Sequence, residues 1–411
     1  MKISRVKIYL KFSIILKSLV SNLQASKIEL SDYLKKTLNK DYLTFFGMCR
    51  TCFIVILEFL KAKYPTKNKI LICSYNLEEM IEIAKLSKFD VKFIDLDFNS
   101  GVMDINLIKR NICENTSAIL FTNMFNNSDV LSELQELCKN RNILLIEDLA
   151  IYFGNFNQNQ NKKTYAGSVG DVSILSFGIM KNVSSIYGGA MLTSNLELHR
   201  FASNLEKSFS QFPKYLYIKK FILFLLLKIL LSKIIYNLFF FYIIKLAKIK
   251  NVKFLLNLIY PAYNFKVKTK IPKEYFSQIS KLSIKIINNF VKDKDFEIEK
   301  EKRKNNNLYY SKLLKNNPNV RTINIRNPNY QNFLDFPIII KNKKKLVIHL
   351  MNKGLETRYH FYSNCEKYYN LKNCNNSELF EKELICLPSH SDISKNRIEK
   401  YCREIDRFYE I

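Results

Sequence analysis

Between about residues 40 and 200, short apolar runs alternate with longer segments of helical periodicity, and this pattern constrains the fold more than any other feature. The predicted strands are 69–74, 91–95, 117–122, 142–147, 172–176 and 189–193, and the predicted helices are 50–63, 77–87, 104–112 and 129–140. Strands separated by helices form a parallel sheet that helices cover on both faces. We therefore expect an α/β fold with a mostly parallel sheet.

The remaining sequence suggests four regions. We expect an N-terminal helical segment over 1–40, a large domain over 41–213, a hydrophobic helical insert over 214–262 and a smaller C-terminal α+β domain over 263–411. The first twenty residues, MKISRVKIYLKFSIILKSLV, predict an amphipathic helix. They do not fit an export signal, because two lysines interrupt the apolar stretch and no small-residue cleavage site follows.

The insert contains the most apolar stretch of the chain, FILFLLLKILLSKIIYNLFFFYII, in which Lys228 and Lys233 are the only charges. Its length would allow a single membrane span. Two central lysines would cost about 2.5–3.5 kcal/mol each, and a span would separate segments that have to pack around one site. We expect a helical hairpin in one leaflet with lysines reaching the phosphates, and hence peripheral membrane contact through 214–262. A buried helix pair at a subunit interface is the alternative.

Charge and cysteine content narrow the functional classes. The 65 Lys+Arg and 37 Asp+Glu residues give a formal charge of +28, which attracts phosphates of any kind. We do not expect nucleic acid as a partner, because there is no compact basic block, RNA-binding aromatic motif or zinc-finger spacing.

Nine scattered cysteines, an odd number, indicate reduced thiols in the cytoplasm. Cys49 and Cys52 form a C-x-x-C without a second pair or a His cluster, so we expect no metal site.

The segment IEDLAIYFG, followed by AGSVGDVSILSFGIMKNVSSIYGGAMLTSN, is the most informative about chemistry. Asp148 ends one predicted strand, and Ser176 and Lys181 follow the end of another. Open α/β sheets place ligands at these strand ends. A lysine that forms an imine and moves a proton, together with an aspartate that keeps a ring nitrogen protonated, is the pair that pyridoxal 5′-phosphate (PLP) chemistry requires. Gly188 and Gly189 would allow close backbone approach beside this site.

The same segment resembles the DegT/StrS-type sugar aminotransferases, whose fold is PLP fold type I. G-S-V-G-D-V-S-I-L-S-F-G-I-M-K-N at 167–182 is similar to the family's G-S-x-G-D followed by S-F-x-x-x-K. The resemblance implies that Lys181 forms the Schiff base and that Asp148 binds the cofactor's ring nitrogen. It also implies cofactor-phosphate contacts from Arg50, Thr51 and Ser176, with the amide groups of a helix N-terminus. Tyr75, in CSYNLEEM, is the candidate for stacking on the cofactor ring.

The sequence also departs from the family pattern. Ile151 stands where many members have a glutamine near the cofactor's phenolic oxygen, and isoleucine cannot donate a hydrogen bond. Some relatives carry a histidine in place of the lysine and are dehydratases, so Lys181 favours transamination. The C-terminal LPSH at 387–390 resembles the family's L-P-x-H. Arg358 and His360 are candidates for substrate contact, although a histidine in such a position is more often a surface residue and any single arginine among 65 basic residues is weak evidence. His390 follows Pro388 and can simply close a turn.

The resemblance implies a two-stage transfer of an amino group. Glutamate would supply nitrogen to the cofactor, and a nucleotide-linked keto-sugar would accept it for glycan or surface-polysaccharide synthesis. Members of this fold type build each site from two subunits, so we expect a homodimer, located in the cytoplasm at the inner face of the membrane. The alternative is a catalytically weak PLP-fold scaffold in a membrane-bound polysaccharide pathway, which Ile151 and the insert favour and which Asp148 and Lys181 disfavour.

Overall fold

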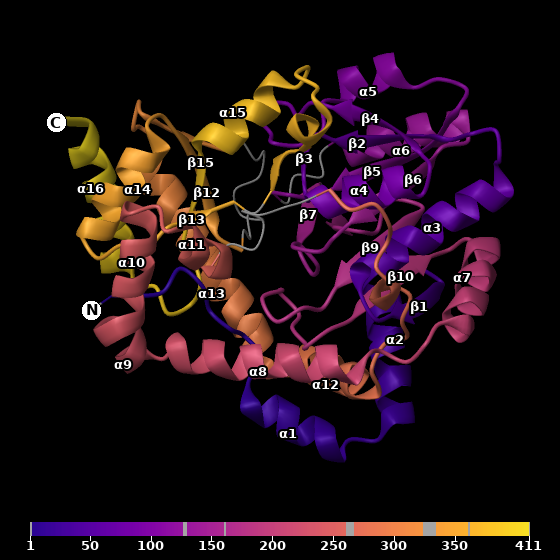
Figure 1. Cartoon of the computed structure of the whole chain (residues 1–411), viewed down its shortest axis with the longest axis horizontal. Helices are drawn as coiled ribbons and strands as arrows, with labels where there is room; N and C mark the ends of the chain where they lie inside the picture. The colour runs from indigo at the N-terminus through magenta and orange to yellow at the C-terminus, as the bar shows by residue number, and fades with distance from the viewer. Residues whose placement is uncertain are drawn as a thin grey trace.

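The structure is a computed structural model that describes residues 2–125, 130–159, 162–259, 267–323, 334–360 and 362–410. A large domain and a smaller domain lie side by side, on the right and left of Figure 1. The large domain is built on a seven-stranded sheet with the strand order β1-β10-β9-β6-β5-β2-β4. Its strands are β1 (Tyr42–Phe46), β2 (Lys69–Cys73), β4 (Asp90–Ile94), β5 (Thr116–Thr122), β6 (Leu144–Asp148), β9 (Val172–Ser176) and β10 (Gly189–Thr193).

The expected mostly parallel sheet is confirmed. β4, β2, β5, β6 and β9 pair in parallel, and β10 is antiparallel to both of its neighbours, β9 and β1. All of the parallel strands therefore end at the same edge of the sheet, which is where the predicted site residues are found. The strands and helices predicted between residues 50 and 193 are present, with boundaries shifted by only a few residues, whereas the strands Phe156–Asn159 and Lys162–Tyr165 and the helix Leu196–Ser208 were not predicted.

Helices cover both faces of this sheet because successive strand side chains point to opposite faces. Ile70 and Ile72 of β2 pack with helices α3 (Cys49–Lys63), α4 (Glu78–Leu86) and α7 (Leu196–Ser208). Leu71 and Cys73 of the same strand pack on the other face with α5 (Ile105–Asn111) and α6 (Leu131–Arg141). A third cluster joins β1, β9 and β10 to α1 (Phe12–Val20), α2 (Leu23–Leu38) and α12 (Lys281–Val291).

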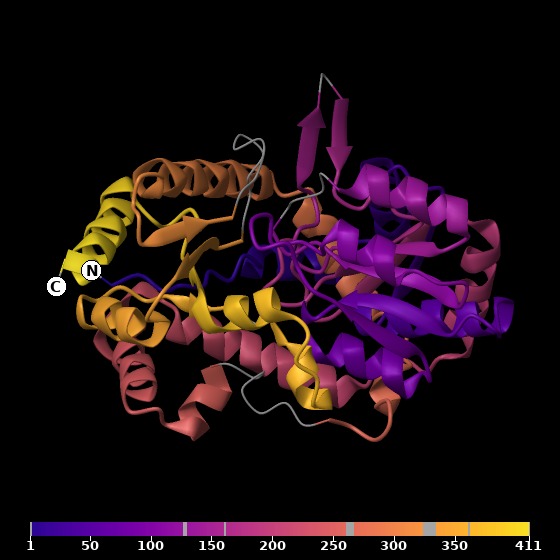
Figure 2. The same cartoon turned by 90° about the horizontal axis from the view of Figure 1, so that it is seen from above.

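The smaller domain has the expected α+β composition. Its antiparallel sheet has the order β11-β12-β15-β13. The elements are β11 (Val320–Thr322), β12 (Phe336–Ile340), β13 (Arg358–Tyr359), β15 (Leu384–Leu387), α13 (Lys294–Leu314), α14 (Lys343–Asn352), α15 (Asn375–Glu383) and α16 (Lys395–Glu410). A short antiparallel pairing of β3 (Tyr75–Asn76) with β14 (Ser363–Asn364) connects this part of the chain to the large domain. The β7–β8 hairpin (Phe156–Asn159 and Lys162–Tyr165) projects from the large domain (Figure 2).

The predicted N-terminal helix is partly wrong. Residues 2–11 are not helical, and the first helix begins at Phe12. Ile8 and Leu10 are both buried, which is the spacing of an extended chain. Arg5 is held by an ion pair to Glu356, and the Ser4 carbonyl oxygen lies 2.8 Å from His390 Nε2. These long-range contacts stabilise an extended conformation that the local amphipathic pattern does not reveal.

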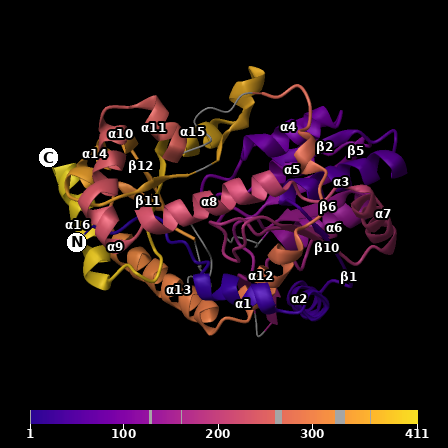
Figure 3. The same ribbon diagram turned by 60° about the horizontal axis from the view of Figure 1, so that its bottom comes forward.

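The insert is helical, as expected, but it is not a hairpin. It consists of α8 (Lys214–Leu230), a second arm formed by α9 (Lys233–Ile235), η1 (Tyr236–Phe240) and α10 (Phe241–Ile249), and then α11 (Lys253–Ile259). The two arms meet at a bend of 64°. Taken together they are long and apolar enough to cross a membrane, whereas no single helix in the described part of the chain is. α8 runs from the large domain to the small one, where α9 and α10 turn along the outer side (Figures 1 and 3).

Candidate active site

Asp148 and Lys181 follow neighbouring strands of the sheet. Asp148 is the last residue of β6 and is buried, with an exposed fraction of 4%. β9 pairs with β6 and ends at Ser176, and the chain then turns so that the Lys181 amide donates to the Gly178 carbonyl oxygen at 3.0 Å. The Ser184 hydroxyl donates to the Lys181 carbonyl oxygen at 2.6 Å and holds this turn.

The two side chains interact electrostatically. Burial raises the pKa of the Asp148 carboxyl group, while the Ala150 N–H bond at 2.9 Å and the positive charge of Lys181 lower it. Burial lowers the pKa of the Lys181 amine, and the negative charge of Asp148 opposes that shift. The structure therefore brings the sequence-predicted pair into one site. A lysine with a lowered pKa spends more of its time as the neutral amine, which is the nucleophilic form.

The N-terminus of α3 lies beside this pair. Cys49 begins the helix after Met48, which provides no side-chain cap, and the first turn contains no acidic residue. The amide groups of the first turn can therefore receive an anion. Gly189 makes the approach possible, because a Cβ atom there would lie 2.3 Å from the Met48 carbonyl carbon. This geometry is compatible with the anion-binding helix N-terminus that the family resemblance implies.

The predicted phosphate-binding side chains on α3 already have other partners. The Thr51 hydroxyl donates to the Tyr275 carbonyl oxygen at 2.5 Å. Arg50 forms an ion pair with Glu79, and its guanidinium carbon lies 5.6 Å from the Tyr275 ring centroid. Burial lowers the pKa of Arg50, but Glu79, Tyr275 and Cys49 together outweigh it, so the net shift of the pKa is upward. Sequence reasoning missed Glu79 and Tyr275, because Tyr275 is 224 residues distant from Thr51 and no motif connects them.

Ser176 and Tyr75 occupy two different parts of the site. Ser176 is half-buried at the end of β9, opposite Gly189 of β10. Tyr75 is almost fully buried, and its hydroxyl lies 3.0 Å from His360 Nδ1. The two rings are stacked with centroids 5.6 Å apart. His360 therefore covers the tyrosine that was predicted to stack on the cofactor, and the roles of both Ser176 and Tyr75 stay predictions.

A cavity of about 980 Å³ opens between the two domains at this point. The large domain contributes Tyr75, Ile151 and Lys181 to its wall, and the small domain contributes Arg358 and His360. The lining includes eight basic residues (Arg5, Lys181, Lys343, Lys344, Lys345, Arg358, Lys367 and Lys382) and three acidic ones (Glu78, Glu381 and Glu383). This excess of positive charge favours an anionic ligand.

The remaining sequence candidates fall inside and outside this cavity. Ile151, in the position where a glutamine is usual, presents an apolar side chain to the cavity. Arg358 forms an ion pair with Asp335 at 2.6 Å. Burial lowers the pKa of His360 well below its ordinary value, and Arg358 adds to this, so the ring is neutral at pH 7. His390 lies elsewhere and holds the extended N-terminal segment, which is a structural role.

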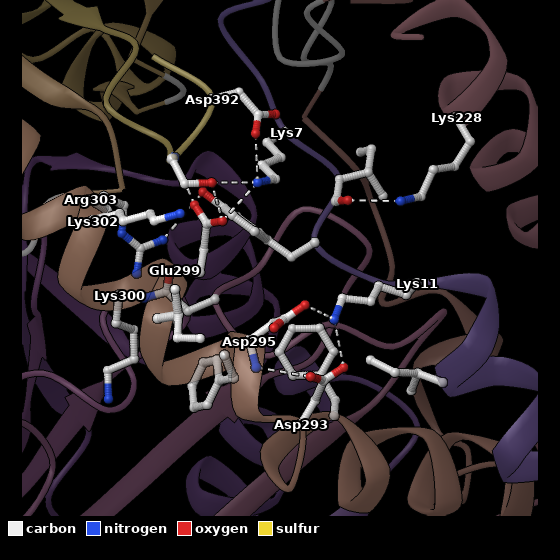
Figure 4. A pocket seen from close by; sticks show the side chains of 18 residues that line it. Lys7, Lys11, Lys228, Asp293, Asp295, Glu299, Lys300, Lys302, Arg303 and Asp392 are labelled. Atoms are coloured by element: carbon white, nitrogen blue, oxygen red, sulfur yellow. Dashed lines mark hydrogen bonds and ion pairs between the residues drawn. The ribbon is translucent and has the colours of Figure 1, made fainter. Parts of the chain in front are cut away.

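A second cavity, of about 460 Å³, lies between the extended N-terminal segment and α13 (Figure 4). Two of its basic residues, Lys7 and Lys11, are paired with carboxylates of the cavity wall. Lys7 pairs with Glu299 at 2.8 Å and with Asp392 at 3.0 Å, and Lys11 pairs with Asp293 at 2.9 Å. Six basic and four acidic residues line this cavity, so its excess of positive charge is smaller than that of the main cavity and it is a weaker candidate for anion binding. No set of three His, Cys, Asp or Glu residues in the described parts of the chain is arranged to hold a metal ion.

The sheet topology and the Asp148–Lys181 pair define a member of the fold-type-I class. A profile of the DegT/DnrJ/EryC1/StrS aminotransferase family matches residues 49–215 and 291–406, so the chain belongs to that family. The gap between the two matched segments contains most of the hydrophobic insert. The resemblance stated from the motif at 167–182 is therefore confirmed over most of the chain.

Curated relatives match only part of their own length. GDP-perosamine synthase of Escherichia coli O157:H7 is 31% identical over 107 residues, which cover 26% of this chain and 28% of that protein. UDP-4-amino-4,6-dideoxy-N-acetyl-beta-L-altrosamine transaminase of Campylobacter jejuni is 32% identical over 118 residues, which cover 28% of this chain and 30% of that protein. A GDP-4-keto-6-deoxy-D-mannose 3-dehydratase of Escherichia coli O55:H7 is 31% identical over 110 residues, 26% of this chain and 27% of that protein.

Solved structures share the fold over almost the whole chain. Helicobacter pylori PseC, an aminotransferase of pseudaminic acid biosynthesis, superimposes with a TM-score of 0.69 at 17% identity and covers 100% of this chain and 98% of its own. A GDP-4-keto-6-deoxymannose-3-dehydratase containing a trapped PLP-glutamate geminal diamine gives a TM-score of 0.71 at 16% identity, with 98% and 99% covered. At these identities the similarity establishes the fold.

Proposed function

We propose that this protein is a PLP-dependent aminotransferase that transfers an amino group to a nucleotide-linked keto-sugar. The observation that carries the proposal is the electrostatically coupled pair Asp148 and Lys181 at one edge of a fold-type-I sheet. Family membership supports transamination as the reaction, and the relatives act on GDP- and UDP-linked sugars. The product would be used for glycan or surface-polysaccharide synthesis.

The residues present fit PLP. Asp148 is a buried carboxylate whose pKa is raised by burial, and it would be stabilised by the protonated ring nitrogen of the cofactor. The uncapped N-terminus of α3 and the hydroxyl of Ser176 would hold the phosphate. Lys181 would bind the cofactor covalently, and its amine would then take up and return the proton at the reacting carbon. When bound, the cofactor supplies an electron sink for this chemistry.

The cavity between the domains would receive the substrates in turn. Its eight basic residues against three acidic ones suit a sugar diphosphate and the carboxylates of an amino donor, which we propose is glutamate. Arg358 is the candidate for a carboxylate or a phosphate because it lines this cavity. We also propose a homodimer, by analogy with the fold type. The nine free cysteines, seven of them buried, support a reducing, cytoplasmic location. We propose the inner face of the membrane within it because of the apolar insert.

Reconstitution with PLP tests this function directly. We expect the purified protein to acquire a visible absorption band from the covalently bound cofactor, and we expect Lys181→Ala to abolish it. Lys109→Ala, at an exposed lysine on α5, is the matched control and should leave the band unchanged. Single-turnover assays with glutamate and a panel of nucleotide keto-sugars would then identify the acceptor. A band that persists in Lys181→Ala would disprove the assignment of that residue.

A second candidate is a catalytically weak scaffold with the same fold. Ile151 offers no hydrogen bond to a ligand in the cavity, and both Arg50 and Thr51 are engaged by other residues. These features would weaken cofactor binding. If the protein is such a scaffold, it should stay colourless after PLP is added and should show no amino transfer in the single-turnover assays.

A further inference from the structure

The insert presents an apolar stripe to the outside of the molecule along α8. Tyr215, Ile218, Ile222, Leu226 and Ile229 are each between 48% and 67% exposed. Their spacing of three or four residues places them on one face of the helix. Isolated exposed apolar residues are common on soluble proteins, but a continuous stripe along a whole helix indicates a contact surface.

The second arm continues the same feature. Ile234, Leu238, Tyr242, Leu246 and Ile249 recur at intervals of three or four residues and are 36% to 71% exposed. Figure 3 shows α8 running across the molecule and the second arm continuing from its end. Each arm therefore has an outward apolar face, although the two arms differ in direction by 64°.

The opposite face of each arm is covered by the rest of the protein. Phe224 of α8 and Phe241 of α10 are almost completely buried. The Tyr236 hydroxyl donates to Glu356 at 2.6 Å, and the Lys248 amine donates to the Thr357 carbonyl oxygen at 2.6 Å. A helix that packs on protein along one side cannot be surrounded by lipid. This surface suits a helix lying in the plane of a membrane interface, with one face immersed.

The charge around the stripe is of one sign. From residue 207 to residue 273 the sequence contains 14 lysines and no aspartate or glutamate. Lys214, Lys219, Lys233, Lys250 and Lys253 are exposed. Lysines beside an apolar face can place their aliphatic stems along it and reach anionic groups with their amines. An isologous contact with a second copy would instead bring lysine-rich surfaces together without acidic partners, which is unfavourable.

We propose that the outward face of α8, α9 and α10 docks on an anionic lipid bilayer, with both arms lying in the interfacial plane. The apolar stripe enters the boundary between headgroups and acyl chains, and the flanking lysines contact lipid phosphates. The docking is independent of the proposed catalytic function, because it uses no residue of the cavity between the domains. If the PLP absorption band is absent, the proposed catalytic function fails. If vesicle binding is absent, the docking proposal fails. The two failures can therefore be told apart.

The test measures binding of the full chain to vesicles of phosphatidylcholine with and without phosphatidylglycerol, by co-flotation. We expect strong binding to the anionic vesicles and a decrease with added salt. Ile222→Gln/Leu226→Gln removes apolar surface without changing charge and should reduce the partition coefficient roughly tenfold or more. Leu196→Gln/Leu371→Gln changes two residues of similar chemistry that are 41% and 40% exposed outside the insert, and this control should bind like the unmodified protein.

Three results would overturn the proposal. The first is equal binding to neutral and anionic vesicles, and the second is unchanged binding by the variant at Ile222 and Leu226. The third is evidence that a second copy of the chain covers the surface. Light scattering without lipid would show this if Ile222→Gln/Leu226→Gln lowers the oligomeric mass and the control variant does not, because the stripe would then be a subunit interface.

Discussion

At the scale of single residues, Glu356 connects three distant parts of the chain. It is fully buried and accepts a hydrogen bond from the Arg5 amide at 3.0 Å. The Tyr236 hydroxyl of the insert donates to the same oxygen, Oε2, at 2.6 Å, and the other oxygen, Oε1, lies 3.2 Å from Arg5 Nε. The extended N-terminal segment and the insert therefore attach to the small domain through one carboxylate.

We predict that Glu356→Ala lowers the free energy of unfolding by about 3–5 kcal/mol, because it leaves the buried Arg5 guanidinium without its counter-charge. Urea denaturation measures the change. Glu58→Ala is the matched control, since Glu58 pairs with Lys61 at 2.8 Å on the surface, where such a pair contributes only about 0–1 kcal/mol. Equal losses in the two variants would contradict the structural role of Glu356.

At the scale of elements, the contact between α3 and β10 positions the candidate phosphate site. Met48 and Gly188 form a parallel bridge, and the backbone of Met48 lies directly against Gly189. The start of α3 is thereby fixed beside the ends of β9 and β10. A helix N-terminus can bind an anion at this place only because residue 189 has no side chain.

We predict that Gly189→Ala destabilises the fold by about 1–3 kcal/mol or more, because the new methyl group would overlap the Met48 backbone, which cannot move without α3. It should also weaken PLP binding, since the helix N-terminus would be displaced. Gly178→Ala is the control, because its Cβ would meet only the Lys181 side chain, at 3.8 Å. The thermal midpoint and the PLP dissociation constant of each variant check this, and similar stability of the two alanine variants would contradict it.

At the scale of the whole molecule, the main cavity exists only because the two domains meet. Lys343 of α14 lies in its wall, and the amine donates to the Glu381 carbonyl oxygen at 2.5 Å. Burial lowers the pKa of Lys343 to about 8, against the opposing charge of Glu381. The lysine is therefore cationic below pH 8 and largely neutral above it.

We predict that the affinity for a UDP-linked hexose falls about tenfold between pH 7 and pH 9, because one charged contact to the diphosphate is lost. Isothermal titration calorimetry measures it. Lys343→Arg keeps its charge over this range and should flatten the pH dependence, whereas Lys343→Met should bind weakly at both pH values. The same pH slope in Lys343→Met would show that another group is responsible.

The sequence by itself determined the large sheet, the family and the pair Asp148 and Lys181. Strand–helix alternation depends on local periodicity. The segment IEDLAIYFG places Asp148 at the end of one strand, and the motif at 167–182 places Lys181 just after the end of its neighbour. Local periodicity also identified the insert as apolar and helical, because apolar character is a property of each segment alone.

Only the tertiary structure decided how distant segments meet. The engagement of Arg50 by Glu79 and of Thr51 by Tyr275 and the extended conformation of residues 2–11 all depend on partners far away in the chain. A pattern of residues cannot specify such partners, since each contact forms between segments whose local sequences carry no information about one another. The same reason explains why the outward and covered faces of α8, both apolar, could be distinguished only in the folded molecule.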